Sequence, residues 1–274
     1  MFNRLIKIIA GFVAKCFRFD TTRETWDTTE YTFDCSGGSG TCTTNTNDFF
    51  LDGTGLGYWK FNDNVEDSLN NYDATPINIT YGVGKFLNAA SWVAGQSYAQ
   101  VNTTDFNLQT FSVSIWFNMT EFQSVNEKTC IIGNYGYAAR LGGNGWYLQV
   151  DDSKMGIEIP QFGQRVTAST DVVLATWQHI VISVEYTAGV SSNTRVIKIF
   201  YNGVSESATT FSDTDAMNYD DGAGGNANDR LSFGTRGQYN FTGGSLTGAL
   251  DQCRIFNRVL NATEAKELFD EKQC

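Results

Sequence analysis

The stretch Gly248-Ala-Leu-Asp-Gln-Cys-Arg-Ile-Phe-Asn-Arg-Val-Leu260 decides the fold of this chain. In its first half, apolar residues such as Leu250 and Ile255 are interspersed with polar residues such as Asp251 and Arg254, which predicts a β-strand. Its second half leads into a helix, because Asn261 can cap the helix N-terminus and Glu264 stands at the capping-box position. Apolar residues then recur with helical spacing, at Ala265, Leu268 and Phe269. One side of that helix is therefore expected to pack against the domain.

The composition is typical of a β-protein with a sizeable core. The 274 residues include 41% hydrophobic and only 18% charged side chains, and Asn, Thr, Ser and Gly are frequent. A formal net charge of −11 disfavours nucleic acid and anionic membranes as partners, because both select basic surfaces. The chain has a single histidine, His179. Most zinc sites and His-dependent catalytic sites are therefore excluded.

An ordered series of strand-like segments begins near residue 56. Phe111-Ser-Val-Ser-Ile-Trp-Phe117 alternates apolar and polar residues, which predicts a strand with one face in a core. Val196-Ile-Lys-Ile-Phe-Tyr-Asn-Gly203 ends in Asn-Gly, a strong signal for a hairpin turn. Three further segments are Gly57-Tyr-Trp-Lys-Phe61, Gly84-Lys-Phe-Leu-Asn-Ala-Ala90 and Trp177-Gln-His-Ile-Val-Ile-Ser-Val184.

These segments and the closing stretch, in this order, resemble the laminin-G-like domains of the concanavalin A-like jelly-roll lectin family. The resemblance covers about residues 56–270. It implies an all-β fold, a two-sheet antiparallel jelly-roll sandwich, with a short C-terminal helix and an N-terminal arm outside the sandwich. In the family's pattern the residue that matches His179 is structural and lies inside a strand, so we expect the same here.

Residues 1–54 differ from the domain expected over residues 55–274. Residues 1–19 are basic and apolar, but Lys7 interrupts the apolar run, which argues against a cleaved secretory signal. The run is also too short for a transmembrane helix. Residues 20–54 are too polar to hold a core of their own. We expect an anchoring helix or an arm docked on another chain, with an uncleaved signal as the alternative.

The resemblance also implies a structural calcium ion. Jelly rolls of this type often hold one between the acidic loop after the first strand and the aspartate of the closing strand, and the matching positions here are Asp63, Asp67 and Asp251. Asp251 could instead accept hydrogen bonds from that loop, and both alternatives stay open. A second acidic loop, residues 213–229, lacks the spacing of an EF-hand, so a solvated loop is favoured there.

The sequence predicts no enzyme. Glycoside hydrolysis needs two carboxylates that face each other across a cleft. Hydrolases of the resembling fold usually carry them on one strand as Glu-x-Asp-x-(x)-Glu, and this motif does not occur here. Glu158 and Glu185 are single acids in strand-like surroundings. A glycoside hydrolase of the same fold is kept as an alternative.

Glycan binding would need aromatic faces and polar side chains on a loop, and residues 134–146 offer them. The candidate ligand-binding residues of this loop are Tyr135, Tyr137, Arg140, Asn144 and Trp146. Trp146 could equally belong to the core. A second polar and aromatic loop contains Gln238, Tyr239 and Asn240, of which Tyr239 is a further candidate.

The six cysteines are too few for a disulfide-dense scaffold. Cys35 and Cys42 flank a loop of small residues that could close as a disulfide ring, and the sequence leaves this pairing open. Cys130 and Cys253 occupy apolar strand positions. Each is therefore expected to be a buried free thiol.

We predict a non-enzymatic module that recognises a glycan or another host-surface ligand. Residues 1–54 would display it through other copies or a larger assembly. A virion protein, such as a phage capsid or tail component, or a cell-surface decoration or adhesion protein fits this organisation, and the location would be the virion or the cell exterior. A purely structural assembly protein without a ligand is the alternative.

Overall fold

The computed structural model describes residues 49–50, 52–68, 70–122, 128–136, 144–213, 215–217, 219, 230–235 and 244–271. By its internal contacts the chain divides into two units, Met1–Thr44 with Asp270–Cys274, and Asn45–Phe269. The fold described below is that of the second unit. The expected arm over residues 1–54 lies largely outside the described residues, as does the pairing of Cys35 with Cys42, so both stay predictions.

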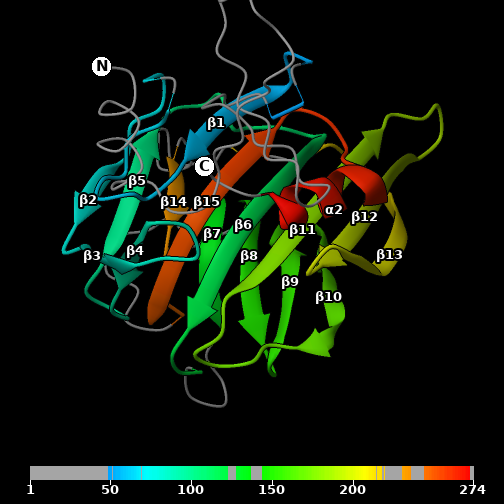
Figure 1. Cartoon of the computed structure of the whole chain (residues 1–274). Coiled ribbons are helices and arrows are strands. Elements are labelled where there is room, and N and C mark those ends of the chain that lie inside the picture. The colour runs from blue at the N-terminus through cyan, green and yellow to red at the C-terminus, as the bar shows by residue number, and fades with distance from the viewer. Residues whose placement is uncertain are drawn as a thin grey trace, which may run out of the picture. The chain divides into compact units, whose positions relative to one another are not determined.

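Two antiparallel sheets form the domain, as the resemblance implied (Figure 1). Among the described residues one sheet has eight strands in the order β13-β12-β11-β6-β15-β4-β3, with β1 paired to β15. Its strands are β1 (Gly55–Trp59), β3 (Thr80–Val83), β4 (Asn88–Trp92), β6 (Phe111–Met119), β11 (Gln178–Thr187), β12 (Asn193–Tyr201), β13 (Val204–Asp213) and β15 (Gly248–Phe256).

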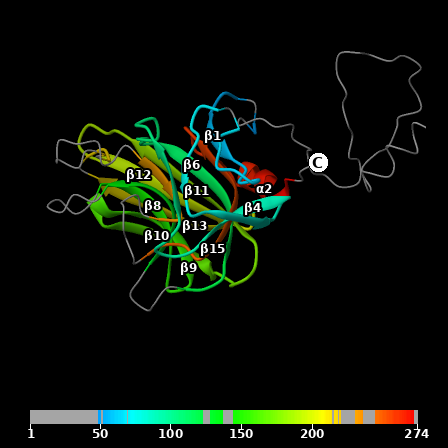
Figure 2. The same cartoon turned by 90° about the vertical axis from the view of Figure 1, so that its left-hand side faces the viewer.

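The second sheet has seven described strands in the order β10-β9-β8-β7-β14-β5-β2. They are β2 (Thr75–Ile77), β5 (Tyr98–Asn102), β7 (Thr129–Gly136), β8 (Asn144–Asp151), β9 (Lys154–Ile159), β10 (Gln164–Asp171) and β14 (Arg230–Phe233). A 3₁₀ turn, η1 (Pro160–Phe162), follows β9, and the helix α2 (Ala262–Asp270) follows β15. Figure 2 shows the cartoon turned by 90°, with β8, β9 and β10 of this sheet labelled. No helix of the described residues is long and apolar enough to cross a membrane.

The core lies between the two sheets and combines aromatic with aliphatic side chains. Alternate residues of β6 point into it, and Phe111, Val113 and Ile115 are fully buried. From the opposite sheet Trp146 stacks on Phe111 with ring centroids 4.7 Å apart. Each such side chain contributes about 1.5–3 kcal/mol through burial. The alternation predicted for residues 111–117 is confirmed.

The closing stretch folds as the sequence predicts, with one irregularity. β15 lies between β6 and β4 and also pairs with β1. Its register against β6 shifts between Asp251 and Arg254, where Gln252 has a φ of 49°. This bulge leaves both Asp251 and Arg254 on the outer face, opposite Trp116 and Ser114 of β6. Bulges of this kind re-aim side chains without breaking a strand.

The capping box of α2 is confirmed. The Asn261 side-chain oxygen accepts hydrogen bonds from the backbone N–H groups of Thr263, at 2.9 Å, and Glu264, at 3.1 Å. In return Glu264 accepts the N–H of Asn261 at 2.8 Å. Both orphan donors at the helix start are thereby satisfied. Leu268 and Ala265 are buried, as expected, in a cluster on the outer face of the eight-stranded sheet.

His179 is a structural residue, as expected. It is 1% exposed, and its Nε2 atom lies 2.9 Å from the Ser114 hydroxyl. Its ring packs against Trp116 with centroids 4.9 Å apart, and Phe269 of α2 stacks on the same tryptophan. Burial, and then the nearby charge of Arg254, lower the pKa of His179 to about 3. The imidazole is therefore neutral at physiological pH.

Cys130 and Cys253 are buried free thiols, also as predicted.

Candidate functional site

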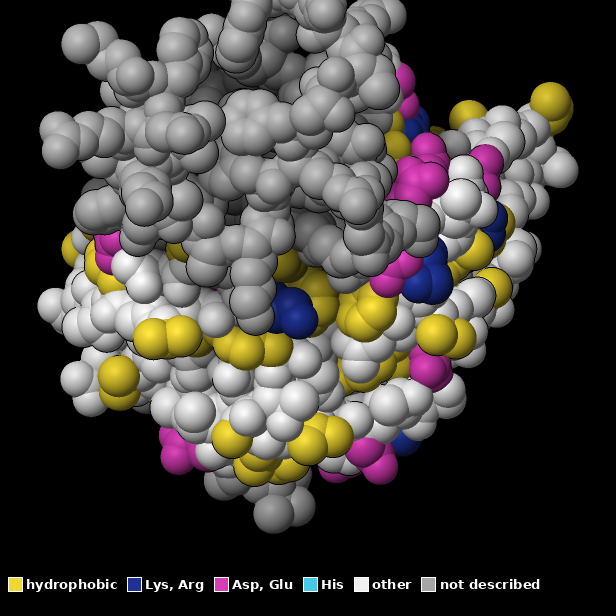
Figure 3. All heavy atoms as spheres, viewed as in Figure 1, with side chains coloured by type: hydrophobic (Ala, Val, Ile, Leu, Met, Phe, Trp, Pro, Cys, Tyr) yellow, Lys and Arg dark blue, Asp and Glu magenta, His cyan; other side chains and the backbone are white. Residues whose placement is uncertain are grey.

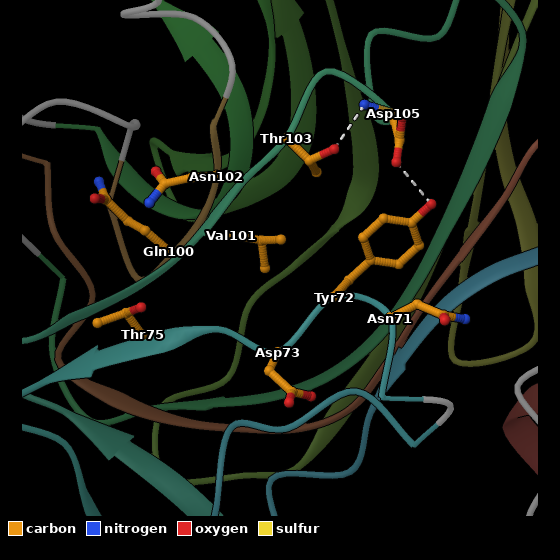
Figure 4. Close-up of a pocket in the computed structure, with 9 residues that line it drawn as sticks. All are labelled: Asn71, Tyr72, Asp73, Thr75, Gln100, Val101, Asn102, Thr103 and Asp105. Carbon is orange, nitrogen blue, oxygen red and sulfur yellow. Dashed lines mark hydrogen bonds between the residues drawn. The ribbon is translucent and has the colours of Figure 1, made fainter.

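A polar pocket of about 350 Å³ opens where β2 and β5 meet the loops beside them (Figure 4). The loop before β2 and β2 itself contribute Asn71, Tyr72, Asp73 and Thr75, and β5 with the loop after it contributes Gln100, Val101, Asn102, Thr103 and Asp105. All of these except Val101 carry hydrogen-bonding side chains. Because it gathers eight hydrogen-bonding side chains around one cavity, this pocket is the candidate site.

The loop before β2 is shaped by a buried carboxylate, that of Asp67, which is 1% exposed. It accepts the backbone N–H of Tyr58 at 2.8 Å and that of Asn71 at 3.2 Å. The N–H of Asp67 in turn donates to Asp73 at 2.9 Å. A buried carboxylate needs such donors, because burial without them would cost several kcal/mol. Asp67 therefore ties the pocket loop to β1.

Tyr72 joins the two walls of the pocket. Its hydroxyl donates to a carboxylate oxygen of Asp105 at 2.9 Å, and Figure 4 draws this bond at the upper right. The ring packs edge to face on Phe106 with centroids 4.8 Å apart. The carbonyl of Tyr72 accepts the indole N–H of Trp59 at 2.9 Å. Burial, and then the hydrogen bond to Asp105, raise the pKa of Tyr72. The phenol therefore stays protonated.

The remaining lining groups offer both donors and acceptors. Asn71, Asn102 and Thr75 are exposed, whereas Gln100 is buried and donates to the hydroxyl of Ser232 at 3.3 Å. Amides and hydroxyls each donate and accept, and carboxylates accept. Such a set complements a ligand with several hydroxyl groups.

The three aspartates expected to hold calcium are each engaged by N–H donors. Both carboxylate oxygens of Asp63 lie 2.9 Å from the amide nitrogen of Asn88. Asp67 is held as described above. Within the described ranges no three or more His, Cys, Asp or Glu side chains form a metal-binding group. A calcium ion bound by Asp63, Asp67 and Asp251 therefore stays a prediction.

Asp251 is held by the turn between β3 and β4, and not by the loop after the first strand that the sequence suggested. It accepts the backbone N–H of Phe86, in the turn between β3 and β4, at 2.9 Å. Gly84 makes this approach possible, because a Cβ atom there would lie 2.7 Å from the Asp251 carboxylate. Burial raises the pKa of Asp251 to about 7, although hydrogen bonds from Phe86 and Gln252 oppose the shift.

The expected glycan loop is only partly described. Tyr137, Arg140 and Tyr239 lie outside the described residues, and so does the side chain of Asn144. The ligand-facing role of Trp146 is wrong, because its ring is 1% exposed and stacks on Phe111 in the core. Tyr135 is 9% exposed, and its ring meets that of Tyr147 edge to face at 5.1 Å. Tyr135 therefore presents little free surface. Most of the acidic loop 213–229 also lies outside the described residues.

Glu158 lacks the environment of a catalytic acid. Its carboxylate accepts from the ammonium of Lys128 at 2.5 Å and the amide of Gln149 at 2.7 Å. Burial raises the pKa of Glu158, but hydrogen bonds from Lys128 and Tyr147 outweigh it and hold the pKa below its usual range. A general acid needs the opposite shift.

The pocket was not predicted from the sequence. Its two halves, Asn70-Asn-Tyr-Asp73 and Asn102-Thr-Thr-Asp105, are short polar runs, and the first contains an aromatic residue. An aromatic residue within a polar run is the same signal that drew attention to residues 134–146. The pairing of the two runs, however, depends on β2 lying beside β5.

Solved structures of similar fold come from extracellular carbohydrate-active and toxin proteins. Domain 4 of AbnA, a GH43 extracellular arabinanase from Geobacillus stearothermophilus solved in complex with arabinotriose, matches with TM-score 0.57 and 18% identity, over 78% of this chain and 98% of that chain. The receptor-binding domain of botulinum neurotoxin type G matches with TM-score 0.56 and 14% identity, over 79% of this chain and 51% of that chain. The binding domain of Paraclostridial Mosquitocidal Protein 1 has TM-score 0.56 and 15% identity, with 79% and 52% covered. These likenesses show the fold.

The sequence itself was also compared with known families and proteins. No curated protein sequence matches it. Residues 93–266 match the model of the concanavalin A-like lectin/glucanases superfamily. This match spans more than half of the chain and agrees with the resemblance in the strand patterns and with the two-sheet fold. The chain therefore belongs to the concanavalin A-like lectin/glucanase superfamily.

Proposed function

We propose that the domain is a non-enzymatic glycan-recognition module and that the pocket around Tyr72 and Asp105 binds the sugar. The observation that carries this proposal is the pocket itself, about 350 Å³ in volume and lined almost wholly by amide, hydroxyl and carboxylate groups. Ligand sites of several hundred Å³ are typical for small ligands. The carbohydrate-binding type of fold supports the same conclusion.

Binding without catalysis accounts for the pocket better than hydrolysis does. Asp73 and Asp105 both line it, and a glycosidase also uses two carboxyl groups. The general acid of a glycosidase, however, is normally shielded from water so that it stays protonated. The side chains of Asp73 and Asp105 are both exposed. Hydrolysis of a bound glycan that is abolished by Asp105→Asn would overturn the non-enzymatic proposal.

Glycan arrays probed with the full chain test the binding proposal. Asn102 heads the sequon Asn-Thr-Thr, so the protein is best produced in bacteria, where N-glycosylation cannot fill the pocket. We expect a double variant, Tyr72→Phe with Asn102→Ala, to bind about 5- to 150-fold more weakly, since each of the two lost hydrogen bonds contributes about 0.5–1.5 kcal/mol. Asn257→Ala is the matched control, because Asn257 is also exposed but does not line the pocket. Equal binding by the double variant and the control would refute the site.

We further propose that residues 1–54 display this module on a larger assembly, at a virion or cell surface or outside the cell. The contrast between the basic, apolar residues 1–19 and the acidic chain as a whole supports a separate role for this segment. On the part of the surface that Figure 3 colours, hydrophobic side chains are scattered among polar ones. That face thus suits exposure to solvent better than a packed interface.

Light scattering of the full chain and of a chain that begins at Asn45 tests the display proposal. Asn45 is chosen because the compact unit begins there and because Phe50 packs on Phe256 at 5.6 Å. We expect the full chain to assemble and the shortened chain to be a folded monomer. Two folded monomers would remove the assembly role.

A further inference from the structure

We infer that the pocket between β2 and β5 selects glycans without acidic groups. It takes uncharged sugar units rich in hydroxyl groups, and it disfavours uronic and sialic acids. This inference rests on the proposed function and concerns the same pocket. It adds the class of sugar, which neither the family nor the fold specifies.

The charges on the pocket wall are all of one sign. Asp73 and Asp105 both line the cavity and are exposed, and none of the nine lining residues is Lys, Arg or His. Carboxylates in ligands are normally bound by Arg or Lys, which supply charge-assisted hydrogen bonds. The negative charge of an acidic sugar would therefore be repelled by the carboxylates of Asp73 and Asp105, and no lining cation would pair with it.

The two carboxylates are fixed in place. Asp105 accepts the phenolic hydroxyl of Tyr72 at 2.9 Å, and its own backbone N–H donates to the hydroxyl of Thr103 at 3.2 Å. Asp73 accepts the backbone N–H of Asp67, which is buried, at 2.9 Å. Neither carboxylate is thus free to turn away from a ligand without breaking a hydrogen bond. Each keeps further lone pairs for a sugar hydroxyl, because an ionised carboxylate has about four acceptor sites.

The expected discrimination follows from the number of like charges. Two unit charges about 4 Å apart in a water-like medium repel by about 1 kcal/mol, which is about fivefold in a dissociation constant. With Asp73 and Asp105 both on the pocket wall, an acidic sugar is expected to bind about 25-fold more weakly than its neutral counterpart. Added salt should reduce this difference, since both carboxylates are exposed.

The test uses matched pairs of glycans and the full-length protein. An array presents neutral oligosaccharides beside the same oligosaccharides capped with a uronic or a sialic acid, and calorimetry then measures the best pair. The double variant Asp73→Asn with Asp105→Asn removes both charges but keeps an acceptor oxygen for each hydrogen bond. Asp152→Asn is the control for the loss of a single charge away from the pocket. Asp152 is exposed in the turn between β8 and β9, and β7 and β14 separate β8 from β5.

We expect the wild type to prefer the neutral member of each pair by at least tenfold. The double variant should bind the two members within about threefold of each other, and Asp152→Asn should behave as the wild type does. If the double variant does not fold, the salt dependence of the wild type decides, because a preference set by charge must shrink as salt is added. Equal or tighter binding of acidic glycans by the wild type would overturn this inference alone. Failure of every glycan to bind the pocket would overturn the proposed function as well.

Discussion

Asp67 offers a direct way to separate two roles for the acidic loop after β1, a hydrogen-bonding role and a calcium-binding role. In the structure its carboxylate accepts the backbone N–H groups of Tyr58 and Asn71. Replacement of Asp67 by alanine removes charge-assisted hydrogen bonds, each of which contributes about 1.5–3 kcal/mol, and leaves buried N–H groups without an acceptor. We expect the free energy of unfolding to fall by about 3 kcal/mol in total.

Thermal unfolding measures this loss. For a domain of this size about 3 kcal/mol corresponds to a fall in Tm of roughly 6–12 °C. The wild type and Asp67→Ala are compared with calcium and with EDTA. If Asp67 acts through hydrogen bonds alone, the difference between the two proteins is the same in both buffers. The variant should also bind glycan more weakly, because Asp67 holds the loop that carries Tyr72 and Asp73, although it does not line the pocket.

The result that would refute this reasoning is a calcium-dependent difference. If EDTA lowers the Tm of the wild type to that of Asp67→Ala, Asp67 is a calcium ligand and the N–H contacts describe only the metal-free state. Glu66→Gln is the matched control, because Glu66 is an exposed neighbour on the same loop. It should leave the Tm unchanged within about 1 °C.

Three further predictions concern stability. Glu206 of β13 accepts hydrogen bonds from the backbone N–H groups of Ser169 and Thr170 on β10, and the bonds from these two residues lower its pKa. The stabilisation by Glu206 is therefore full above the unfolded pKa near 4.5 and is lost as pH falls through the lower folded pKa. Glu206→Gln should thus reduce the loss of stability in acid that urea unfolding measures, and an unchanged pH profile would contradict this. Burial raises the pKa of Asp251 to about 7. The contribution of Asp251 to the free energy of unfolding should therefore decline as pH rises from the unfolded pKa near 4 to about 7, and Asp251→Asn should flatten this decline. A variant with the same pH dependence as the wild type would contradict the raised pKa of Asp251. Trp146→Ala should cost about 3–5 kcal/mol of unfolding free energy, as expected for a core tryptophan, and a loss below about 1 kcal/mol would show that the ring is not in the core.

The sequence predicted local features of this fold better than features that depend on long-range pairing. The capping box of α2 and the alternation in β6 are set by residues within a few positions of each other, and both are confirmed. The bulge at Gln252 was not predicted, because the apolar spacing of the closing stretch does not reveal where the register shifts.

The site illustrates the same limit. Tyr72 and Asp105 are 33 positions apart and meet only because β2 pairs with β5. β2 itself is short, with three residues that include Pro76, so it gives little strand signal. Trp146 was misassigned for a related reason. A glycine-rich loop with aromatic residues suggests a binding face, but the parity of a residue in the following strand decides whether its ring enters the core.

The most direct test of the central claim is a calorimetric titration of the full chain with the best neutral glycan from the array. We expect Tyr72→Phe with Asn102→Ala to lower the affinity about 5- to 150-fold, while Asn257→Ala should not change it. Unchanged affinity in the double variant, with its fold intact by circular dichroism, would contradict the account and place the glycan site elsewhere on the molecule.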